Sequence, residues 1–436
     1  MRAQVPMALQ TLPPHVTGFR CLCCGGHYPS SGEAHACVPL GAGSTLDVTY
    51  DYDLVKQALR HERGGLDRIG MWRYRALLPI WPDAPLPLLH VGGTPLYQAD
   101  RLASRLGLKQ LWIKDEGRQP TGSLKDRASA LAIVMARSAG ISTIATASTG
   151  NAAAALAGMG AGQGLQLIIF VPASVLPAKV AQLRVYGATV ILVDGNYDQA
   201  FDLCQEACRH FGWYNRSTGV NPFMTEGKKT VAYEIIEQIS QCDAAHVPDC
   251  IIVGVGDGCI LGGVHKGLKD LLAVGKIRHM PRLFGVQAEG SDYLYQAWKA
   301  GEDIAEKSVI PTYGVADSLM AGLPRDRFKA MAAVRTTEGA FIRVSDADIL
   351  AAIPVLARGC GVFAEPAAAA AYAGLVNARA EGGIRPGERV ALLSTGTGLK
   401  DVSSMMLAVS HEQHAVFHSP PSLLGLQQAW PQAQLA

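Results

Sequence analysis

The sequence predicts an α/β fold, in which a largely parallel sheet is covered by helices on both faces. Short, continuous apolar runs alternate with segments of helical pattern along most of the chain. A strand buried on both faces is apolar throughout, whereas a strand with one wet face alternates apolar and polar residues. The runs predicted as strands are STIATAS (142–148), LQLIIFVP (165–172), ATVILVD (188–194), DCIIVGVG (249–256), RLFGVQAE (282–289) and RVALLSTGTG (389–398).

The composition fits a globular protein with a large core. Of the 436 residues, 49% are apolar and 17% are charged. At about 100–200 residues per domain, this length predicts two or three domains. The 39 basic and 37 acidic residues nearly balance, which argues against nucleic acid as a partner. The N-terminus lacks the apolar stretch of a signal peptide, and no run of about 18 apolar residues predicts a membrane helix. We therefore expect a cytoplasmic protein with no membrane partner.

The remaining segments have patterns of their own. Residues 1–50 are dense in Cys, Gly, Pro and His and lack helical periodicity, which predicts a small appended segment. A helix is predicted for YDLVKQALR (52–60), and a turn, short strand, helix and strand for 91–116. The Ala-rich EPAAAAAYAGLV (365–376) is predicted as a buried helix.

Three of the predicted strands end in turns of glycine and hydroxyl residues, at 149–152, 257–263 and 395–401. Ligands of open α/β sheets bind beyond the carboxyl ends of the strands, where glycines let backbone N–H groups approach an anion. One such turn, GVGDGC, would also fit a degenerate dinucleotide loop or tight strand–helix packing. Three together predict a ligand with a phosphate and a second anionic group, such as pyridoxal phosphate joined to an amino acid. Neither a G-x-x-x-x-G-K-[ST] loop nor an early strand–GxGxxG–helix unit is present, which argues against an NTPase and a nicotinamide dehydrogenase.

The stretch PTGSLKDRA (120–128) places Lys125 at the start of a predicted helix, just after a turn of Pro, Gly and hydroxyl residues. A surface lysine and a lysine that holds an aldehyde cofactor as a Schiff base both fit this setting. The glycine-rich turns elsewhere in the chain favour the second interpretation.

Taken together, the motifs resemble those of the fold-type II (tryptophan synthase β-like) pyridoxal-phosphate enzymes, and among them the threonine synthase-like group. The resemblance covers residues 51–401, and its motifs occur in the family's order. They are GGTPL (92–96), KDE (114–116), PTGSLKDRA (120–128), ASTGNAAAALA (147–157), NPFMTEGKKTVAYEI (221–235), GVGDGCILGG (254–263) and STGTGLKD (394–401).

The resemblance implies roles for individual residues. Lys125 would form the Schiff base with the cofactor and then act as general base and acid at the α-carbon of the substrate. The cofactor phosphate would be bound by backbone N–H groups of the loop around 254–260. The loop residues implied are Gly256, Asp257, Gly258, Cys259 and Ile260. Asp257 and Cys259 stand where family loops often carry Asn.

The other two turns would bind the ring of the cofactor and the substrate. Asn151 would donate a hydrogen bond to the 3′ oxygen of the cofactor. The substrate carboxylate would be held by Ser148, Thr149, Gly150, Asn151 and Ala152. Thr395, with Ser394 as its neighbour, would face the pyridine nitrogen. A hydroxyl there leaves that nitrogen largely unprotonated, which suits elimination and replacement at Cβ better than transamination.

The family also implies a domain organisation and an assembly. A large domain would consist of residues 51–129 and 234–410, with a smaller α/β domain inserted at 130–233. Residues 1–50 would form a Cys-rich, ribbon-like segment, and residues 411–436 a C-terminal tail. Members of this family are usually homodimers, so we expect a homodimer that acts on a small amino acid.

The N-terminal stretch CLCCGGHYPSSGEAHAC (21–37) resembles an eroded zinc ribbon. Cys21, Cys24, His35 and Cys37 would complete a Cys₃His zinc site. Leu40 occupies the place of the fourth cysteine of a ribbon, so the metal can equally have been lost and the turn held by packing. The missing cysteine favours the interpretation without metal.

The substrate is the point on which the chain departs from the family. Where threonine synthases usually have NSxNPxRxxGQKT, this chain has TGVNPFMTEGKKT (218–230). Met224 replaces the arginine and Gly219 the serine expected to hold the substrate phosphate, and Lys228 or Lys229 would have to compensate. Gln119 also replaces the usual Asn before the turn at 120–122. The sequence therefore predicts a threonine synthase-like lyase acting on a hydroxy- or O-phospho-amino acid. The alternatives are a threonine or serine ammonia-lyase, a β-replacement enzyme, and a catalytically silent binding protein.

Overall fold

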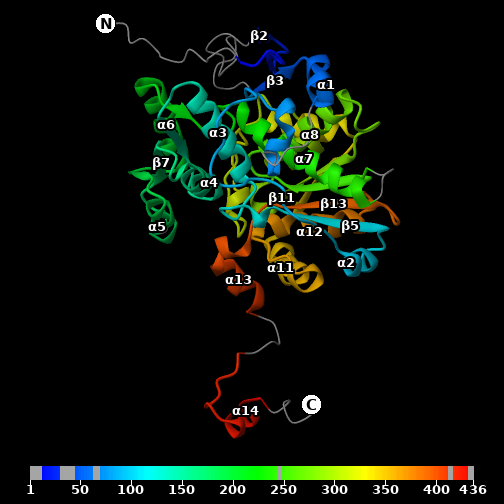
Figure 1. The fold of residues 1–436 in the computed structure, drawn as a ribbon. Coiled ribbons are helices and arrows are strands. Elements are labelled where there is room, and N and C mark those ends of the chain that lie inside the picture. Colours follow the sequence, from blue (N-terminus) through cyan, green and yellow to red (C-terminus); the bar gives the residue numbers. More distant parts are fainter. Residues whose placement is uncertain are drawn as a thin grey trace.

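The computed structural model of the chain describes residues 12–29, 45–61, 69–175, 177–242, 247–410 and 416–430. It contains two sheets of mainly parallel strands, each packed between helices, and a small antiparallel sheet near the N-terminus (Figure 1). This arrangement confirms the predicted α/β fold class. The domain boundaries stay a prediction.

The large sheet has six strands in the order β12-β11-β10-β13-β5-β4, and only β4 runs antiparallel to its neighbour. Their bounds are β4 Leu96–Gln98, β5 Gln110–Asp115, β10 Cys250–Gly254, β11 Arg282–Ala288, β12 Ala340–Val344 and β13 Arg389–Ser394. The central strand β10 is buried at all five positions, as expected for a strand covered on both faces. The apolar runs at 249–256, 282–289 and 389–398 correctly predicted β10, β11 and β13.

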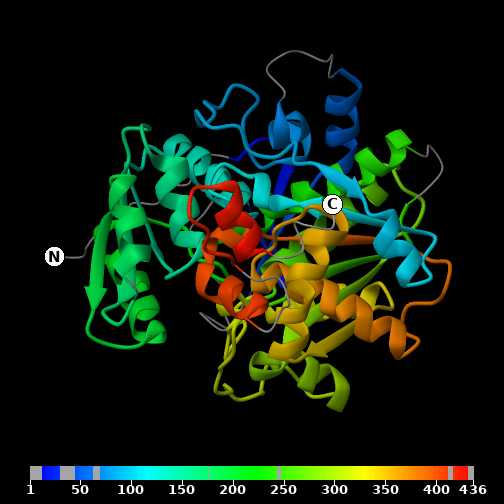
Figure 2. The ribbon, with the colours of Figure 1, turned by 90° about the horizontal axis from the view of Figure 1, so that it is seen from below.

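The small sheet has four parallel strands in the order β8-β7-β6-β9. Their bounds are β6 Thr143–Ala147, β7 Gln166–Pro172, β8 Thr189–Val193 and β9 Tyr214–Asn215. The run at 188–194 was expected to be a strand buried on both faces, and this is wrong for β8, which is largely exposed because it is the edge of the sheet. Figures 1 and 2 show the green segment that carries this sheet on one side of the molecule.

Most of the helices cover the faces of the two sheets. Their bounds are α1 Tyr52–His61, α2 Asp100–Arg105, α3 Lys125–Ser138, α4 Asn151–Gly160, α5 Pro177–Val185, α6 Tyr197–Phe211, α7 Phe223–Cys242, α8 Cys259–Ala273, α9 Tyr293–Ala300, α10 Arg327–Thr336, α11 Asp346–Cys360, α12 Pro366–Ala380, α13 Val402–Val409 and α14 Leu423–Ala429. Alternate residues of a strand point to opposite faces. Accordingly, Ile251 and Val253 of β10 join the core with α8, whereas Ile252 joins the core with α12. Helix α12 contains the Ala-rich stretch that was predicted to be buried, and it is buried along most of its length.

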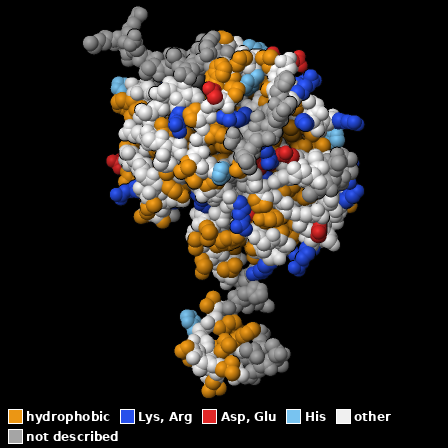
Figure 3. All heavy atoms as spheres, in the orientation of Figure 1, with side chains coloured by type: hydrophobic (Ala, Val, Ile, Leu, Met, Phe, Trp, Pro, Cys, Tyr) orange, Lys and Arg blue, Asp and Glu red, His pale blue; other side chains and the backbone are white. Residues whose placement is uncertain are grey.

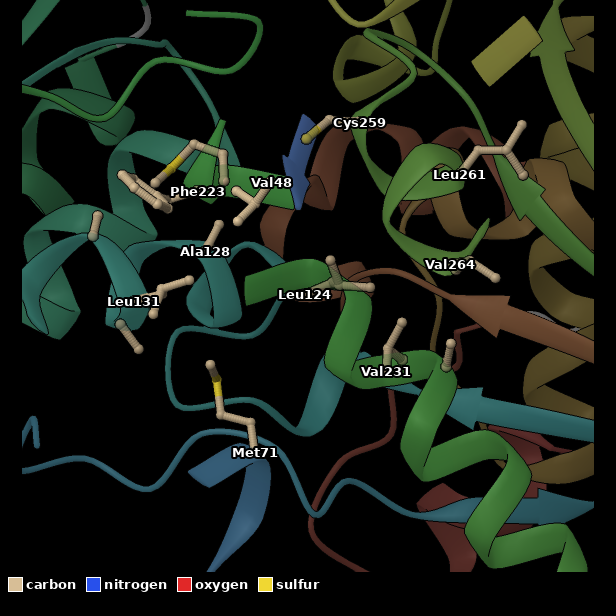
Figure 4. Close-up of a cluster of buried hydrophobic side chains, with 14 of the residues drawn as sticks. Val48, Met71, Leu124, Ala128, Leu131, Phe223, Val231, Cys259, Leu261 and Val264 are labelled. Atoms are coloured by element: carbon tan, nitrogen blue, oxygen red, sulfur yellow. The ribbon is translucent and has the colours of Figure 1, made fainter. Parts of the chain in front are cut away.

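The N-terminal sheet is fastened to α7 and α8 by buried contacts. It consists of β1 Val16–Cys21, β2 His27–Pro29 and β3 Leu46–Tyr50, all antiparallel. The Tyr50 hydroxyl donates to Glu226 of α7, and the Tyr52 hydroxyl donates to Asp270 of α8 at 2.5 Å. Lys266 of α8 donates to the carbonyl oxygen of Val48 at 2.7 Å. Figure 4 shows Val48 in the same buried cluster as residues of α3, α7 and α8.

The C-terminal part of the chain has a different surface. Figure 1 shows α14 apart from the two sheets, and Figure 3 shows apolar side chains gathered over this part of the molecule. The exposed apolar residues of α13, α14 and the segment between them include Val402, Met406, Leu407, Val416, Phe417, Leu423 and Leu424. Neither sheet covers these side chains.

A buried network of charges joins the large sheet to α3 and α7. Arg127 of α3 makes two hydrogen bonds to Glu116, at 2.7 Å each, and two to Glu234 of α7, at 2.8 Å each. Lys114 of β5 donates to Glu234 at 2.7 Å. Burial alone would raise the pKa of Glu234, but the charges of Arg127 and Lys114 hold it well below its ordinary value. Each of these buried charges therefore depends on the others, because removing one leaves its partners buried without a counter-charge.

The substitution Glu234→Gln tests this network. It should lower the free energy of unfolding by roughly 3–5 kcal/mol, because Arg127 and Lys114 lose their shared buried counter-charge. The carboxylate has a depressed pKa in the folded state. Its contribution is therefore complete above the ordinary value of 4.5 and is lost as the pH falls below it. Denaturant unfolding at several pH values measures both effects.

The matched control is Glu302→Gln, because Glu302 is 47% exposed in its pair with Lys307. This change should cost no more than about 1 kcal/mol. Equal losses in the two variants would show that the buried network is not what stabilises this region.

Candidate active site

The turns that follow β6, β10 and β13 meet at two adjoining cavities between the sheets. The smaller, of about 50 Å³, is lined by Lys125, the loop 254–261 and Thr395. The larger, of about 630 Å³, is lined by the turn 149–151 and by residues of the segments 317–318, 365–367 and 399–403. Ser318 and Ala367 line both cavities, so the two adjoin. The structure thus brings the three sequence-predicted turns to one place, although they lie far apart in the chain.

Lys125 is the first residue of α3, and the turn before it is fixed by hydrogen bonds. The backbone N–H and the hydroxyl of Thr121 donate to Asp126, at 2.7 and 2.5 Å. The N–H of Leu124 donates to the carbonyl oxygen of Thr395 at 2.9 Å, which ties this turn to the end of β13. The Leu124 side chain is buried in the core (Figure 4). Lys125 is therefore held at the cavity by a rigid turn.

The amine of Lys125 has an altered proton affinity. Burial, and next the positive charge of Lys228, lower the pKa of Lys125 to about 8, although Glu365 opposes this shift. A larger fraction of the amine is therefore neutral near pH 7 than in an ordinary lysine. The neutral amine is the form that attacks an aldehyde.

The loop 256–260 is shaped to bring its backbone close to an anion. Gly258 has φ +90°, and a Cβ there would lie 2.8 Å from the carbonyl oxygen of Asp326. A Cβ on Gly256 would lie 3.0 Å from Leu319 Cα. The loop leads into α8, a helix of 15 residues that begins at Cys259, so its N–H groups and the positive end of the helix dipole face the same cavity. These features fit a phosphate group.

The side chains of Asp257 and Cys259, at which the loop departs from the family pattern, contact other protein groups. The Asp257 side chain accepts a hydrogen bond from the N–H of Arg325 at 3.3 Å, and burial raises its pKa. Cys259 lies with its Sγ 3.6 Å from the hydroxyl of Thr225, and burial raises the pKa of this thiol. Both side chains thus hold the loop in place, and the loop's backbone N–H groups are left for a ligand.

The two adjacent lysines of α7 have different surroundings. Lys228 lines the smaller cavity, and its Nζ lies 3.5 Å from the hydroxyl of Thr218. Lys229 lies on another face of the helix and is paired with Glu226 at 2.5 Å and Asp270 at 2.7 Å. Lys229 is therefore not available to a ligand here. Met224 is completely buried in the hydrophobic core.

The turn after β6 lies at the larger cavity. Thr149, Gly150 and Asn151 line it, and a Cβ added to Gly150 would meet nothing within 4 Å. Ser148 supports the turn by accepting a hydrogen bond from the N–H of Gly150 at 3.2 Å. Ala152 follows in the first turn of α4. The open space above this turn fits the predicted site for a carboxylate.

Asn151 has a partner that the sequence did not suggest. Its Nδ2 lies 2.9 Å from both carboxylate oxygens of Glu365, the residue before α12. Burial raises the pKa of Glu365, and Asn151 and Lys125 oppose the shift. The sequence does contain a signal for Glu365, because it is an acidic residue at the start of an otherwise apolar, Ala-rich stretch. The motifs assigned no role to it.

The end of β13 carries two hydroxyl residues. Thr395 lines the smaller cavity. The Ser394 hydroxyl is buried, and no hydrogen-bond partner for it is found in the part of the chain that the structure describes. Ser394 lines neither cavity, so of these two hydroxyls that of Thr395 is the one that faces the site.

The proposed zinc ligands fall only partly within the structure. Cys21 is buried and Cys24 is exposed, whereas His35 and Cys37 lie outside the described residues. Within the described ranges, no group of three or more His, Cys, Asp or Glu side chains is placed to hold a metal ion. The described helices also include none that is long and apolar enough to span a membrane.

Comparison with known proteins agrees with this geometry. A family model described as "Pyridoxal-phosphate dependent enzyme" matches residues 87–396. The chain belongs to this family. Two relatives of this pyridoxal-phosphate enzyme are threonine synthases, from Methanocaldococcus jannaschii (35% identical over 393 residues, 89% of this chain and 94% of the relative) and from Methanosarcina acetivorans (36% over 389 residues, 89% and 93%).

Solved structures show the same fold. Threonine deaminase isoform 2 from Solanum lycopersicum aligns with a TM-score of 0.62 at 21% identity, over 74% of this chain and 88% of that one. Diaminopropionate ammonia lyase from Escherichia coli aligns with a TM-score of 0.63 at 19% identity, over 84% and 92%. Membership of the family makes pyridoxal phosphate the cofactor. The glycine-rich loop and the Lys125 amine, which line the same cavity, fit that molecule.

The assignment of Lys125 as the residue that attaches the cofactor can be tested chemically. Borohydride reduction of the loaded enzyme, followed by peptide mapping, should place a pyridoxyl group on Lys125. The Lys125→Ala variant should lose the visible absorption band and turnover, while its thermal unfolding stays close to that of the wild type. A pyridoxyl group on Lys228 or any other lysine would contradict the assignment.

The lowered pKa of Lys125 predicts the pH dependence of cofactor uptake. Because only the neutral amine attacks the aldehyde, the rate at which cofactor-free protein takes up pyridoxal phosphate should rise with pH, with its midpoint near the pKa of about 8, and level off above it. Stopped-flow absorbance measures this rate. In Lys228→Gln, which removes one cause of the shift, the midpoint should move upward. A midpoint at the ordinary lysine value of 10.5 in the wild type would refute the prediction.

Proposed function

We propose that this chain is a threonine synthase-like enzyme, which converts O-phosphohomoserine and water to L-threonine and phosphate. The observation that carries the proposal is the similarity to threonine synthases, which extends over 89% of the chain. Bound pyridoxal phosphate supplies an electron sink for the carbanion that forms when the substrate loses a proton.

The residues of the chain divide the work. Backbone groups of the turn 149–151 bind the substrate carboxylate, and the loop 256–260 binds the cofactor phosphate. Lys125, whose pKa is lowered to about 8, would remove and return protons at the substrate carbons. Thr395 faces the ring nitrogen with a hydroxyl, which suits replacement and elimination better than transamination.

A second function is favoured by one specific observation. Met224 occupies the position at which the family pattern has a phosphate-binding arginine, and its side chain lies in the core. An enzyme without a site for a distal phosphate would act as a threonine or serine ammonia-lyase, or as a β-replacement enzyme. The presence of Lys125 at the cofactor cavity argues against a catalytically silent binding protein. The homodimer stays a prediction.

Parallel assays separate the two functions. Incubation with O-phosphohomoserine should release phosphate and form threonine in equal amounts, whereas L-threonine and L-serine should give little 2-oxo acid. Malachite-green detection of phosphate and chromatography of amino acids measure these products. Rapid formation of 2-oxo acid from threonine or serine, with no threonine formed from O-phosphohomoserine, would replace the first function by the second.

A further inference from the structure

Lys228 of α7 is a buried cation that lines the smaller cavity without a counter-charge. The residue is 1% exposed, and its Nζ lies 3.5 Å from the hydroxyl of Thr218, which lines the same cavity. None of the carboxylates in the described part of the chain forms an ion pair with it. Burying a charge without a counter-charge is costly, so an unpaired ammonium at a cavity indicates a site for an anion.

The packing of α7 against α8 directs this side chain toward the loop 256–260. Thr225 and Lys228 lie on one face of α7. The Thr225 hydroxyl lies 3.6 Å from the Sγ of Cys259, the first residue of α8, and a Cβ added to Gly263 would lie 3.0 Å from the Lys228 Cβ. The two helices therefore run in the same direction here. Because the side chains of a helix lean toward its N-terminus, that of Lys228 leans toward the first turn of α8, where the loop ends.

The neighbouring lysines have other roles or partners. Lys229 is paired with two carboxylates, at 2.5 and 2.7 Å, and Lys329 lies 3.5 Å from Asp326. Lys125 is the residue assigned to the cofactor aldehyde. Lys228 is therefore the cation of this group that is left for an anion in the smaller cavity.

The loop brings an acidic side chain to the same cavity. Asp257 lines it and accepts a hydrogen bond from the N–H of Arg325 at 3.3 Å, but it forms no ion pair with any basic side chain that the structure describes. Asp257 stands where family loops often carry Asn, and Lys228 stands where the family pattern has Gln. These two departures from neutral residues have opposite charges and line one cavity, so together they leave its net charge unchanged.

We propose that Lys228 binds the cofactor phosphate and offsets the charge of Asp257, so that a loop with an acidic residue still holds this anion. The loop and the N-terminus of α8 already bring N–H groups to the smaller cavity. An ammonium adds a compact charge with several donors, which suits phosphate. Without it, the phosphate and Asp257 would repel each other. The inference depends on the cofactor and not on the proposed substrate.

The test uses cofactor-free protein and two ligands without an aldehyde, 4-deoxypyridoxine 5′-phosphate and 4-deoxypyridoxine. They cannot attach to Lys125, and they differ only in the phosphate group. Calorimetric titration gives their dissociation constants. Lys228→Gln should weaken binding of the phosphate ester about 10- to 100-fold, the range for losing a charge-assisted hydrogen bond, and change binding of 4-deoxypyridoxine less than about threefold. Lys299→Gln, which removes an exposed lysine of α9, should change neither.

The variant Asp257→Asn tests the compensation of charge. Asn keeps an oxygen that can accept from the N–H of Arg325. Because a like charge near the phosphate is removed, Asp257→Asn alone should bind the phosphate ester about three- to tenfold more tightly than the wild type. The double variant with Lys228→Gln has the neutral pair of the family pattern. It should bind the ester at least about fivefold more tightly than Lys228→Gln alone.

Other results overturn the inference. Equal weakening of both ligands in Lys228→Gln would show a structural role, and unchanged binding of both would show that Lys228 does not contact the cofactor phosphate. A selective loss in Lys228→Gln with no recovery in the double variant would refute the compensation. If Lys228→Gln does not fold, Asp257→Asn decides alone: tighter binding of the phosphate ester supports the proposal, and unchanged or weaker binding rejects it.

Discussion

Arg127 makes two hydrogen bonds to each of two buried carboxylates, and these bonds fix the position of the first turn of α3. Glu116 comes from the end of β5 and Glu234 from the middle of α7. Lys125 lies two residues before Arg127, so its position depends on the same four hydrogen bonds. Because every member of the group is buried, none can be removed without leaving another charge unbalanced. The large sheet, α3 with its Lys125, and α7 are therefore held in fixed positions without a ligand.

Much of the fold was predictable because its strands are buried on both faces and leave continuous apolar runs. The runs predicted β6, β7, β10, β11 and β13, whereas β9 has two residues and β12 has an exposed position, so neither produced such a run. Most of the candidate site was also accessible to prediction, since glycine and hydroxyl turns after strands have a recognisable pattern. Their joint location at two adjoining cavities follows from parallel strands having a common carboxyl edge.

The charged residues that complete the site could not be predicted in this way. Lys228 and Lys229 are adjacent and chemically equal in the sequence, and only the packing of α7 decides that one faces the cavity and the other the N-terminal sheet. Glu365 is a single charge at the start of an apolar segment, and no spacing links it to a motif. The importance of these charged residues lies in what surrounds them in space, which is the part of the chemistry that short motifs do not encode.

The N-terminal sheet has a consequence for how this enzyme can be cut or shortened. The Tyr50 hydroxyl of β3 donates to Glu226 of α7, and the Val48 carbonyl of β3 accepts from Lys266 of α8, so two buried charges of these helices have their partners in this sheet. Removal of the residues up to the end of β3 would expose these buried charges to water. It would also loosen α7 and α8, which carry Lys228 and follow the loop 256–260. The described strands of the N-terminal segment thus support the two helices that carry Lys228 and follow the cofactor loop.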